Sequence, residues 1–590
     1  MNNINTSKRD GASKTKRMGT VKRLAGYLLK RKWLMLCALV MMLVANLLAL
    51  IGPKISGSAI DAIAEGATDF DKVFFYCALM AGFYILSAAF SYVLSVLMIK
   101  LSQSIVKSMR REVMDRLLTL PVSYFDNHPA GDIISRISYD IDTVNTSLSG
   151  DVLAILASFI TVVGSFVMMV SISPVMLLVF LITIPASLLF TAYKTKKIQP
   201  YFRKRSGKLG ELNGYAEEML SGHSSIKAGS REEHVIDSFA KRNENAVTAY
   251  YDADYHGCIV GPSVNFINNL SLALISILGG FLFLGGGITL GNLSSFVLYS
   301  RRFAGPINEM ASVLTELQSA MAAAERVFRL LDEAPETPDK PNAHVFDSVN
   351  GDISFKNVDF GYNEKGLTLK DITMHAAKGK TVAIVGPTGA GKTTIINLLM
   401  RFYDINSGAI ELDGVETRDA ARDSLRSGFS MVLQDTWLFD GTVRENIAYG
   451  NGEVTSEQVE QAAKAAHIHD YIMSLEKGYD TVLSDEGGGI SKGQQQLITI
   501  ARAMLSDASV LILDEATSNV DSRTEELIQR AMLSLMKDKT CIIIAHRLST
   551  VKNADTVLVL KDGAILQQGT HETLVSTPGF YHDLYYAQFE

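Results

Sequence analysis

Four long intervals of the chain contain no Asp, Glu, Lys or Arg: Trp33–Pro53, Val73–Ile99, Val152–Tyr193 and Tyr255–Ser300. A helix needs about 20 apolar residues to cross a bilayer. The first two intervals therefore suit one span each, and the last two suit two spans joined by the turns SISP and GGGITLGN. The pattern predicts six spans, at about 33–53, 73–99, 152–171, 174–193, 258–284 and 291–311.

Two long polar segments, 100–150 and 194–254, separate these spans. Their charged and apolar residues alternate at helical spacing, which predicts helical extensions of the spans. Independent small domains are disfavoured, because neither segment has enough apolar residues for its own core. Lysines and arginines crowd both segments and the stretch before Trp33, so we expect both termini and both extensions on the cytoplasmic side of a bacterial-type cell membrane. The first span is longer than a signal-peptide core and should be retained.

The composition changes again after the sixth span. DEAPETPDKPNAH, from Asp332 to His344, carries three prolines and several acids, which is typical of a linker. Beyond it, short apolar runs alternate with helical segments, as in an α/β domain. The predicted fold is multi-domain: a cytoplasmic N-terminal segment (1–32), a six-helix transmembrane domain with long cytoplasmic helical extensions (33–331), a linker (332–350) and an α/β P-loop nucleotide-binding domain (351–590).

Overall composition adds little. The net charge of −6 is spread unevenly along the chain, and the four cysteines show neither metal-ligand spacing nor a disulfide framework. Nothing in the sequence indicates a nucleic acid partner.

The segment GPTGAGKT follows the apolar run TVAIV and precedes the helical pattern IINLLMRF. This is the strand–loop–helix context that a P-loop requires, with glycines that let backbone N–H groups face phosphates. Lys392 would reach the β- and γ-phosphates of ATP, and Thr393 would bind Mg²⁺. A glycine-rich turn without function is a poor alternative in this context. The predicted ATP-binding residues here are Gly386, Pro387, Thr388, Gly389, Ala390, Gly391, Lys392, Thr393 and Thr394.

Two further strands end in residues with suitable chemistry. SVLILDEATSNVD places Asp514, a candidate Mg²⁺ ligand, beside Glu515, a candidate general base for the attacking water. CIIIAHRLS ends in His546, which could sense a γ-phosphate. Adjacent carboxylates are otherwise often helix caps, and a lone histidine is usually structural. The ordered series of motifs is what favours a catalytic role for Lys392, Glu515 and His546.

That order, GPTGAGKT, VLQD, ISKGQQQ, VLILDEATSNVD and AHRLS, resembles the nucleotide-binding domain of ATP-binding cassette (ABC) proteins. With six preceding spans, nearly the whole chain resembles an ABC exporter half-transporter. The resemblance implies that Tyr362 stacks on adenine and that Gln434 contacts Mg²⁺. It implies that residues 518–521 form a loop crossing a dimer interface. Two segments, Val122–Asn127 and Glu211–Ala216, look like the coupling helices that dock on nucleotide domains.

The family's signature segment usually reads LSGGQ and binds the ATP held by the opposite subunit. Here it reads Ile490, Ser491, Lys492, Gly493 and Gln494, so a lysine replaces the first glycine. A chain whose signature departs from the usual sequence while its catalytic residues are intact resembles the catalytic-glutamate subunit of bacterial heterodimeric multidrug exporters. We therefore expect a second, different ABC half-transporter as partner, and a homodimer remains the alternative.

For the cargo, Asn265, Asn268 and Asn269 lie at helical spacing in the fifth span and could line a cavity, although helix-to-helix hydrogen bonding explains asparagine equally well. We expect no charge inside any span, which disfavours a strongly ionic substrate. The predicted function is efflux of small amphipathic or hydrophobic compounds from the membrane lipid, with lipid flipping as the alternative. An ATP-gated regulator or channel would not need the carboxylate of Glu515, and six spans are excessive for an anchored soluble ATPase.

Overall fold

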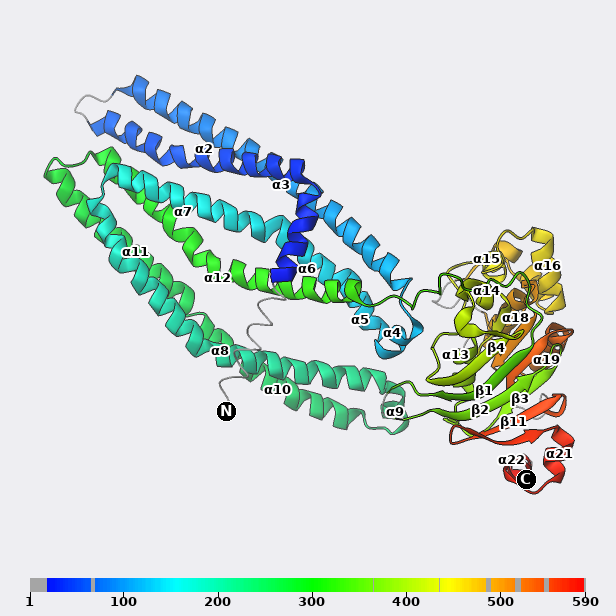
Figure 1. Cartoon of the computed structure of the whole chain (residues 1–590). Coiled ribbons are helices and arrows are strands. Elements are labelled where there is room, and N and C mark those ends of the chain that lie inside the picture. The colour runs from blue at the N-terminus through cyan, green and yellow to red at the C-terminus, as the bar shows by residue number, and fades with distance from the viewer. Residues whose placement is uncertain are drawn as a thin grey trace. The chain divides into compact units, whose positions relative to one another are not determined.

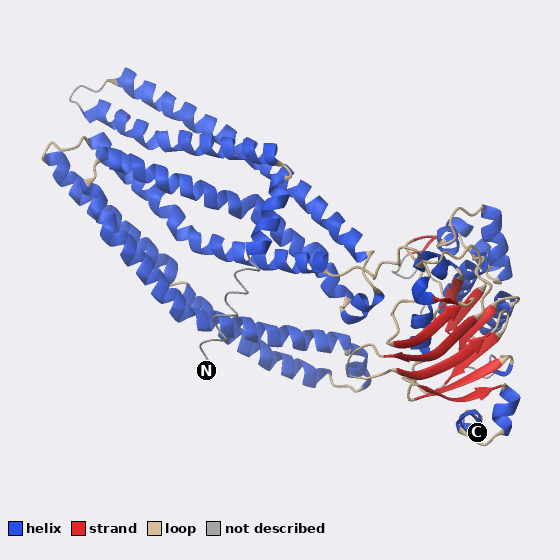
Figure 2. Ribbon diagram, viewed as in Figure 1, coloured by secondary structure: helices blue, strands red, loops and turns tan. Residues whose placement is uncertain are grey.

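The computed structural model describes residues 18–64, 69–363, 366–434, 436–483, 490–514, 521–545 and 551–587, and for 307–312, 314 and 587 it describes the backbone alone. The chain forms two compact units (Figure 1). The helical unit holds the chain up to Leu118 and Ala130–Glu333, and the sheet unit holds Thr119–Pro129 and Ala334–Glu590. Among the described residues, strands occur only in the sheet unit, as Figure 2 shows.

The helical unit is built from long helices. Five stretches in the described part of the chain are long and apolar enough to cross a membrane: Lys32–Ala64, Phe70–Leu117, Ala130–Ile172, Val175–Ser221 and Glu232–Leu284. The sixth predicted span falls in α12 (Leu290–Asp332), which is not among those five. The helices of this unit include α2 (Lys32–Ala64), α3 (Phe70–Leu117), α5 (Ala130–Ser135), α6 (Ile141–Thr146), α7 (Val152–Ile172), α8 (Leu178–Ser221), α9 (His223–Ala228), α10 (Glu232–Gly257), α11 (Val260–Leu284) and α12.

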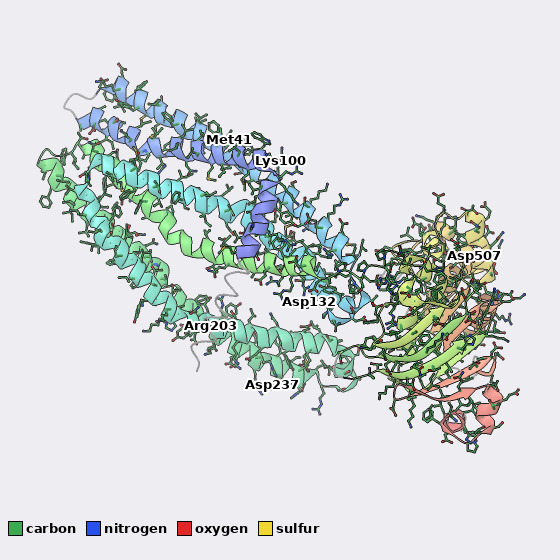
Figure 3. All side chains as sticks on the ribbon, viewed as in Figure 1. Met41, Lys100, Asp132, Arg203, Asp237 and Asp507 are labelled. Carbon is green, nitrogen blue, oxygen red and sulfur yellow. The ribbon has the colours of Figure 1, made fainter. Side chains whose placement is uncertain are left out.

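The polar segments are continuous with the apolar helices, as their spacing predicts. Helix α3 runs without a break past Lys100, where the charge-free interval ends, and α8 continues past Arg203 (Figure 3). The second segment that resembles a coupling helix is not a separate helix. Residues Glu211–Ala216 lie inside α8, and the separate short helix is α9, which begins after Gly222.

Helices α2 and α12 approach each other closely at two glycines. A Cβ built on Gly291 would lie 2.0 Å from the carbonyl oxygen of Gly57, and one built on Gly57 would lie 2.5 Å from the carbonyl oxygen of Gly291. Asp61 of α2 fixes the start of α12, because its carboxylate accepts from the Gly291 N–H at 2.7 Å and from the Thr289 hydroxyl at 2.8 Å. Small residues at such crossings let two membrane helices pack backbone against backbone.

Replacing Gly291 by Ala is expected to lower the thermal unfolding midpoint of the purified protein by several degrees. The added methyl group must push apart two backbones, and overpacking of this kind costs about 1–3 kcal/mol. Gly82→Ala on α3 is the matched control, since a Cβ there meets nothing within 4 Å. Equal midpoints for the two variants would contradict the close crossing.

The sheet unit contains a six-stranded sheet in the order β12–β11–β3–β10–β9–β6, within the described residues. Strands β11 (Thr556–Lys561), β3 (Thr381–Val385), β10 (Thr540–Ile544), β9 (Val510–Asp514) and β6 (Phe429–Val432) are parallel, and β12 (Ala564–Gly569) is antiparallel to β11. A second, antiparallel sheet has the order β2 (Leu369–Ala376), β1 (Ile353–Phe360), β4 (Ser407–Leu412) and β5 (Val415–Glu416), and β7 (Gly441–Thr442) pairs with β8 (Val482–Leu483).

Both faces of the parallel strands are buried. In β3, Ala383 and Val385 belong to one apolar cluster, while Val382 and Ile384 belong to another on the opposite face. Strands that are covered on both faces read as continuous apolar runs, which is why TVAIV shows no alternation. The described helices of this unit include α13 (Lys392–Leu399), α14 (Arg422–Ser427), α15 (Val443–Ala448), α16 (Ser456–Ala465), α17 (His469–Ser474), α18 (Lys492–Leu505), α19 (Ser522–Met536), α21 (His571–Ser576) and α22 (Phe580–Ala587).

The acidic stretch after α12 is bound to the sheet unit by arginines. Arg422 donates from Nη1 to Asp339 at 2.9 Å, and Arg401 lies 3.4 Å from the same carboxylate. Arg426 donates to Glu336 at 2.6 Å. The side chains of Arg401 and Arg422 are only 7% and 8% exposed, so these carboxylates neutralise charges that are largely removed from water.

Candidate functional site

The loop after β3 has the backbone that phosphate binding requires. Gly386, Gly389 and Gly391 have φ angles of 155°, 83° and 102°, a region that residues with a Cβ rarely adopt. At Gly386 a Cβ would also lie 2.2 Å from the carbonyl oxygen of Leu560. A backbone of this kind lets N–H groups face a phosphate at the N-terminus of α13, where the helix dipole favours an anion.

Lys392 begins α13 and folds back over this loop. Its Nζ donates to the carbonyl oxygens of Gly386 at 2.8 Å and Pro387 at 3.1 Å. The residue is 8% exposed, and burial lowers the pKa of its ammonium group while the Asp514 carboxylate opposes that shift. The ammonium group is thus held at the mouth of the loop, and the neighbouring Thr393 is exposed.

The order of the strands in the six-stranded sheet brings residues of the other motifs to the sheet edge at which the glycine loop begins. Strands β3, β10, β9 and β6 are parallel, so their C-terminal ends share one edge of the sheet. Asp514, the last residue of β9, is paired with Ile544 of β10, and Ile544 is in turn paired with Ile384, two residues before the glycine loop begins. Gln434 follows β6 at this edge and is exposed. Glu515, residues 518–520 and His546 lie outside the described residues.

The predicted adenine-stacking residue lies beside the loop. Tyr362 is 45% exposed, and its hydroxyl donates to Thr394 Oγ1 at 3.1 Å and accepts from Asn397 at 3.2 Å. Tyr403 stands edge-on to this ring, with centroids 4.9 Å apart. The Tyr403 hydroxyl donates to Asp126 of α4 (Val122–Asn127), and burial together with this bond raises the pKa of Tyr403.

The altered signature forms an ordinary helix start. Ser491 caps α18: its hydroxyl accepts from the Gln494 N–H at 3.3 Å, and the Gln494 side chain accepts from the Ser491 N–H at 2.8 Å. Lys492 is the first helical residue and is exposed, while Gly493 is buried. The backbone at Lys492 is right-handed, so a side chain here costs nothing in conformation. The lysine is compatible with the local fold.

A second site lies within the helical unit. A cavity of about 300 Å³ is bounded by α8, α11 and α12, and the three predicted asparagines line it: Asn265, Asn268 and Asn269. Arg301 of α12 lines it too. The expectation of charge-free spans is therefore wrong, because the sixth predicted span, 291–311, carries Arg301, Arg302 and Glu309.

Sequence reasoning missed Arg301, Tyr403 and Asp126. The two adjacent arginines inside a predicted span were a usable signal, since an ionisable residue in a membrane helix is a functional candidate by default. Tyr403 and Asp126 gave none, because they are 277 positions apart in the chain.

Known proteins match the chain over both units. The profile of the "ABC transporter transmembrane region" matches residues 35–307, and that of the "ABC transporter" matches 369–518. The ABC transporter ATP-binding protein YfiC of Bacillus subtilis is 41% identical over 99% of this chain and 97% of its own. A fatty acid ABC transporter ATP-binding/permease protein of Mycobacterium bovis is 42% identical, over 89% and 83% of the two chains.

An ATP-dependent lipid A-core flippase of Syntrophus aciditrophicus is 33% identical over 86% of this chain and 84% of its own. The solved structure of a bacterial Atm1-family ABC exporter with ATP bound superposes with a TM-score of 0.78 at 27% identity, covering 94% of this chain and 98% of that one. The chain thus belongs to the ABC transporters and is an exporter half-transporter, in which a multi-pass membrane-spanning domain precedes a domain that hydrolyses ATP coupled to transport.

Proposed function

We propose that this half-transporter exports amphipathic or hydrophobic compounds by alternating access, with both termini and the nucleotide-binding domain in the cytoplasm. The observation that carries the proposal is the cavity of the helical unit, in which amide and guanidinium groups lie beside Phe180, Ile184 and Phe303. A space with polar and apolar walls suits a molecule that has both kinds of surface. Relatives named for fatty acids and for lipid A-core support a cargo of this class.

In the proposed ATP site, the glycine loop and Lys392 bind the phosphates, and Tyr362 stacks on adenine. Thr393, Gln434 and Asp514 offer hydroxyl, amide and carboxylate oxygens at one sheet edge, which is the hard donor set that Mg²⁺ prefers. When bound, Mg²⁺ would neutralise charge on the phosphates. Glu515 orients and deprotonates the attacking water, and His546 donates to the γ-phosphate.

Tyr362→Leu is expected to weaken ATP binding about 3–10-fold, because stacking between aromatic rings contributes about 0.5–1.5 kcal/mol. Tyr362→Phe keeps the ring and loses only the hydroxyl contacts with Thr394 and Asn397, so it should bind ATP nearly as well as the unmodified protein. Titration of the purified transporter with a fluorescent ATP analogue compares the two. Equal weakening by Leu and Phe would assign Tyr362 a structural role through its hydroxyl.

We also propose that the partner is a different half-transporter. Ser491, Lys492, Gly493 and Gln494 would cap ATP held by that partner's P-loop, and the lysine would mark the less active of two sites. The second candidate is a homodimeric lipid flippase, which the lipid A-core flippase relatives favour. Helices α4 and α9 are the proposed coupling helices.

The intact mass of the tagged transporter, purified from its native membranes, separates these candidates. A complex with a second chain of similar size supports the heterodimer. Two identical copies would overturn it and would mean that a lysine-bearing signature serves working sites. ATP-dependent uptake of amphiphiles into inside-out vesicles then tests export itself, and uptake that does not depend on ATP would overturn the pump.

A further inference from the structure

The cavity of the helical unit is lined by polar residues and by apolar residues. Its polar residues are Arg301, three amides, Asn265, Asn268 and Asn269, which we call the amide cluster, and the hydroxyl residues Thr183, Ser187, Ser271 and Ser300. The apolar wall consists of Phe180, Ile184, Leu272 and Phe303, from α8, α11 and α12. No Asp or Glu is among the described side chains that line the cavity, which exclude those of 307–312. The described lining therefore carries a positive charge and no negative one.

The two adjacent arginines of α12 differ in what they contact. Arg302 is satisfied by the protein, because its Nη1 donates to the Ala49 carbonyl oxygen at 2.6 Å and its Nη2 to the Tyr84 hydroxyl at 3.5 Å. Arg301 is exposed and has no hydrogen bond or ion pair with any described residue. Of the two, only Arg301 keeps its donors available to a molecule in the cavity.

Two hydroxyl groups of the cavity, those of Thr183 and Ser271, are also satisfied by the protein. The Thr183 hydroxyl is occupied within the protein, since it donates to Val179 and shares a hydrogen bond of 3.1 Å with Ser271. The amide cluster makes no hydrogen bond to described residues, so its donors and acceptors also remain available. Asn268 lies one helical turn after Asn265, and Asn269 follows Asn268 directly. All three therefore lie along one stretch of α11.

A guanidinium group in a membrane helix is costly unless it is paired or hydrated, and such residues face the interior and bind ligands or counter-ions. Arg301 lies 11 residues after the start of α12, or roughly 16 Å along the helix axis. It is well inside the predicted span and away from its end, where a long side chain could reach the membrane surface.

We propose that Arg301 and the amide cluster bind the anionic head of a single-chain amphiphile, whose tail packs on the apolar wall. This inference rests on the proposed export function and names its substrate class. Guanidinium and amide groups match the oxygen atoms of a carboxylate or a phosphate. The volume of about 300 Å³ is at the lower limit for ligand sites, which favours one chain over a two-chain lipid.

Equilibrium binding to the full transporter in phosphatidylcholine nanodiscs tests the site. The probes share one chain and differ in the head: dodecanoate, dodecyl phosphate, dodecanol and dodecyltrimethylammonium, each corrected for binding to empty nanodiscs. The two anions should bind at least tenfold more tightly than dodecanol. A preference for one anion identifies the head as carboxylate or phosphate, whereas tighter binding of the cation would overturn the proposal.

Arg301→Gln should weaken binding of the anions about 10–100-fold and leave dodecanol unchanged, because only a charge-assisted hydrogen bond is lost. Arg301→Lys should restore most of the affinity. Lys100→Gln removes an exposed charge of α3 that does not line the cavity, so its anion binding should equal that of the unmodified protein. If Arg301→Gln leaves anion binding unchanged, or weakens dodecanol equally, the proposed site is wrong.

Transport measurements distinguish the proposed binding site from the proposed export function on which it rests. If ATP drives none of the four amphiphiles into inside-out vesicles while Arg301 still governs head preference in binding, export is wrong and the site stands. If ATP drives uptake without any dependence on Arg301 or on head charge, the site is wrong and export stands.

Discussion

Replacing Glu515 by Gln is expected to reduce ATP hydrolysis by the assembled transporter about 10²–10⁴-fold and to stop ATP-driven transport. The substitution removes the carboxylate that would take a proton from the attacking water, and general-base catalysis contributes a factor of that size. It leaves Lys392 and the glycine loop intact, so ATP binding should persist. Phosphate release, nucleotide binding and uptake into inside-out vesicles are measured on the same preparation.

The matched control is Glu526→Gln on α19, which makes the same chemical change 11 positions further along the chain. Glu526 pairs with Arg530, but both side chains are 62% exposed, and exposed pairs contribute little. This variant should hydrolyse and transport normally. If transport survives Glu515→Gln, the pump assignment fails and an ATP-gated regulator becomes the better description.

Replacing Asp339 by Ala is expected to lower the thermal midpoint of the sheet unit by about 5–10 °C. The change removes a carboxylate that contacts the buried guanidinium groups of both Arg401 and Arg422. Removing one partner of a fully buried pair costs about 3–5 kcal/mol. Asp339 is 32% exposed and water can enter, so we expect the free energy of unfolding to fall by roughly 2–3 kcal/mol. For a domain of this size, that loss corresponds to a midpoint shift of about 5–10 °C.

The neighbouring residue provides the control. Lys340 pairs with Asp419, yet the two side chains are 64% and 50% exposed, so Lys340→Ala should shift the midpoint by about a degree at most. Intrinsic fluorescence during heating of the purified transporter compares both variants. Equal shifts would mean that the acidic stretch is a loose linker, as its composition suggests.

The local features of the fold were readable from the sequence. Charge-free intervals located the long helices, and the strand–loop–helix context located the glycine loop, because both are set by residues adjacent in the chain. The predicted place of one helix boundary was wrong, because it depends on a single residue. The helical pattern through Glu211 continues to Ser221, and the break falls at Gly222. The pairing of Asp339 with Arg401 and Arg422 could not be foreseen, since sequence periodicity carries no signal at separations of 62 and 83 positions.

The candidate sites divide in the same way. Motif spacing predicted the P-loop residues and the three cavity asparagines, and the structure places the latter around one cavity. The role of Arg301 needed the structure, because sequence alone does not distinguish it from Arg302, whose donors bind Ala49 and Tyr84. The lysine of the signature segment is accommodated at the start of α18, so we expect its effect at the proposed contact with the partner's nucleotide.

The assignment of α4 to the sheet unit makes that unit discontinuous in sequence. Thr119–Pro129 leaves the helical unit, contributes Asp126 as the partner of Tyr403, and returns, all before the main part of the sheet unit begins at Ala334. A fragment starting at Ala334 would therefore lack one of its own components. Chimaeras that exchange nucleotide-binding domains between half-transporters should carry Thr119–Pro129 along with the C-terminal residues, because the unit of exchange is two segments of the chain.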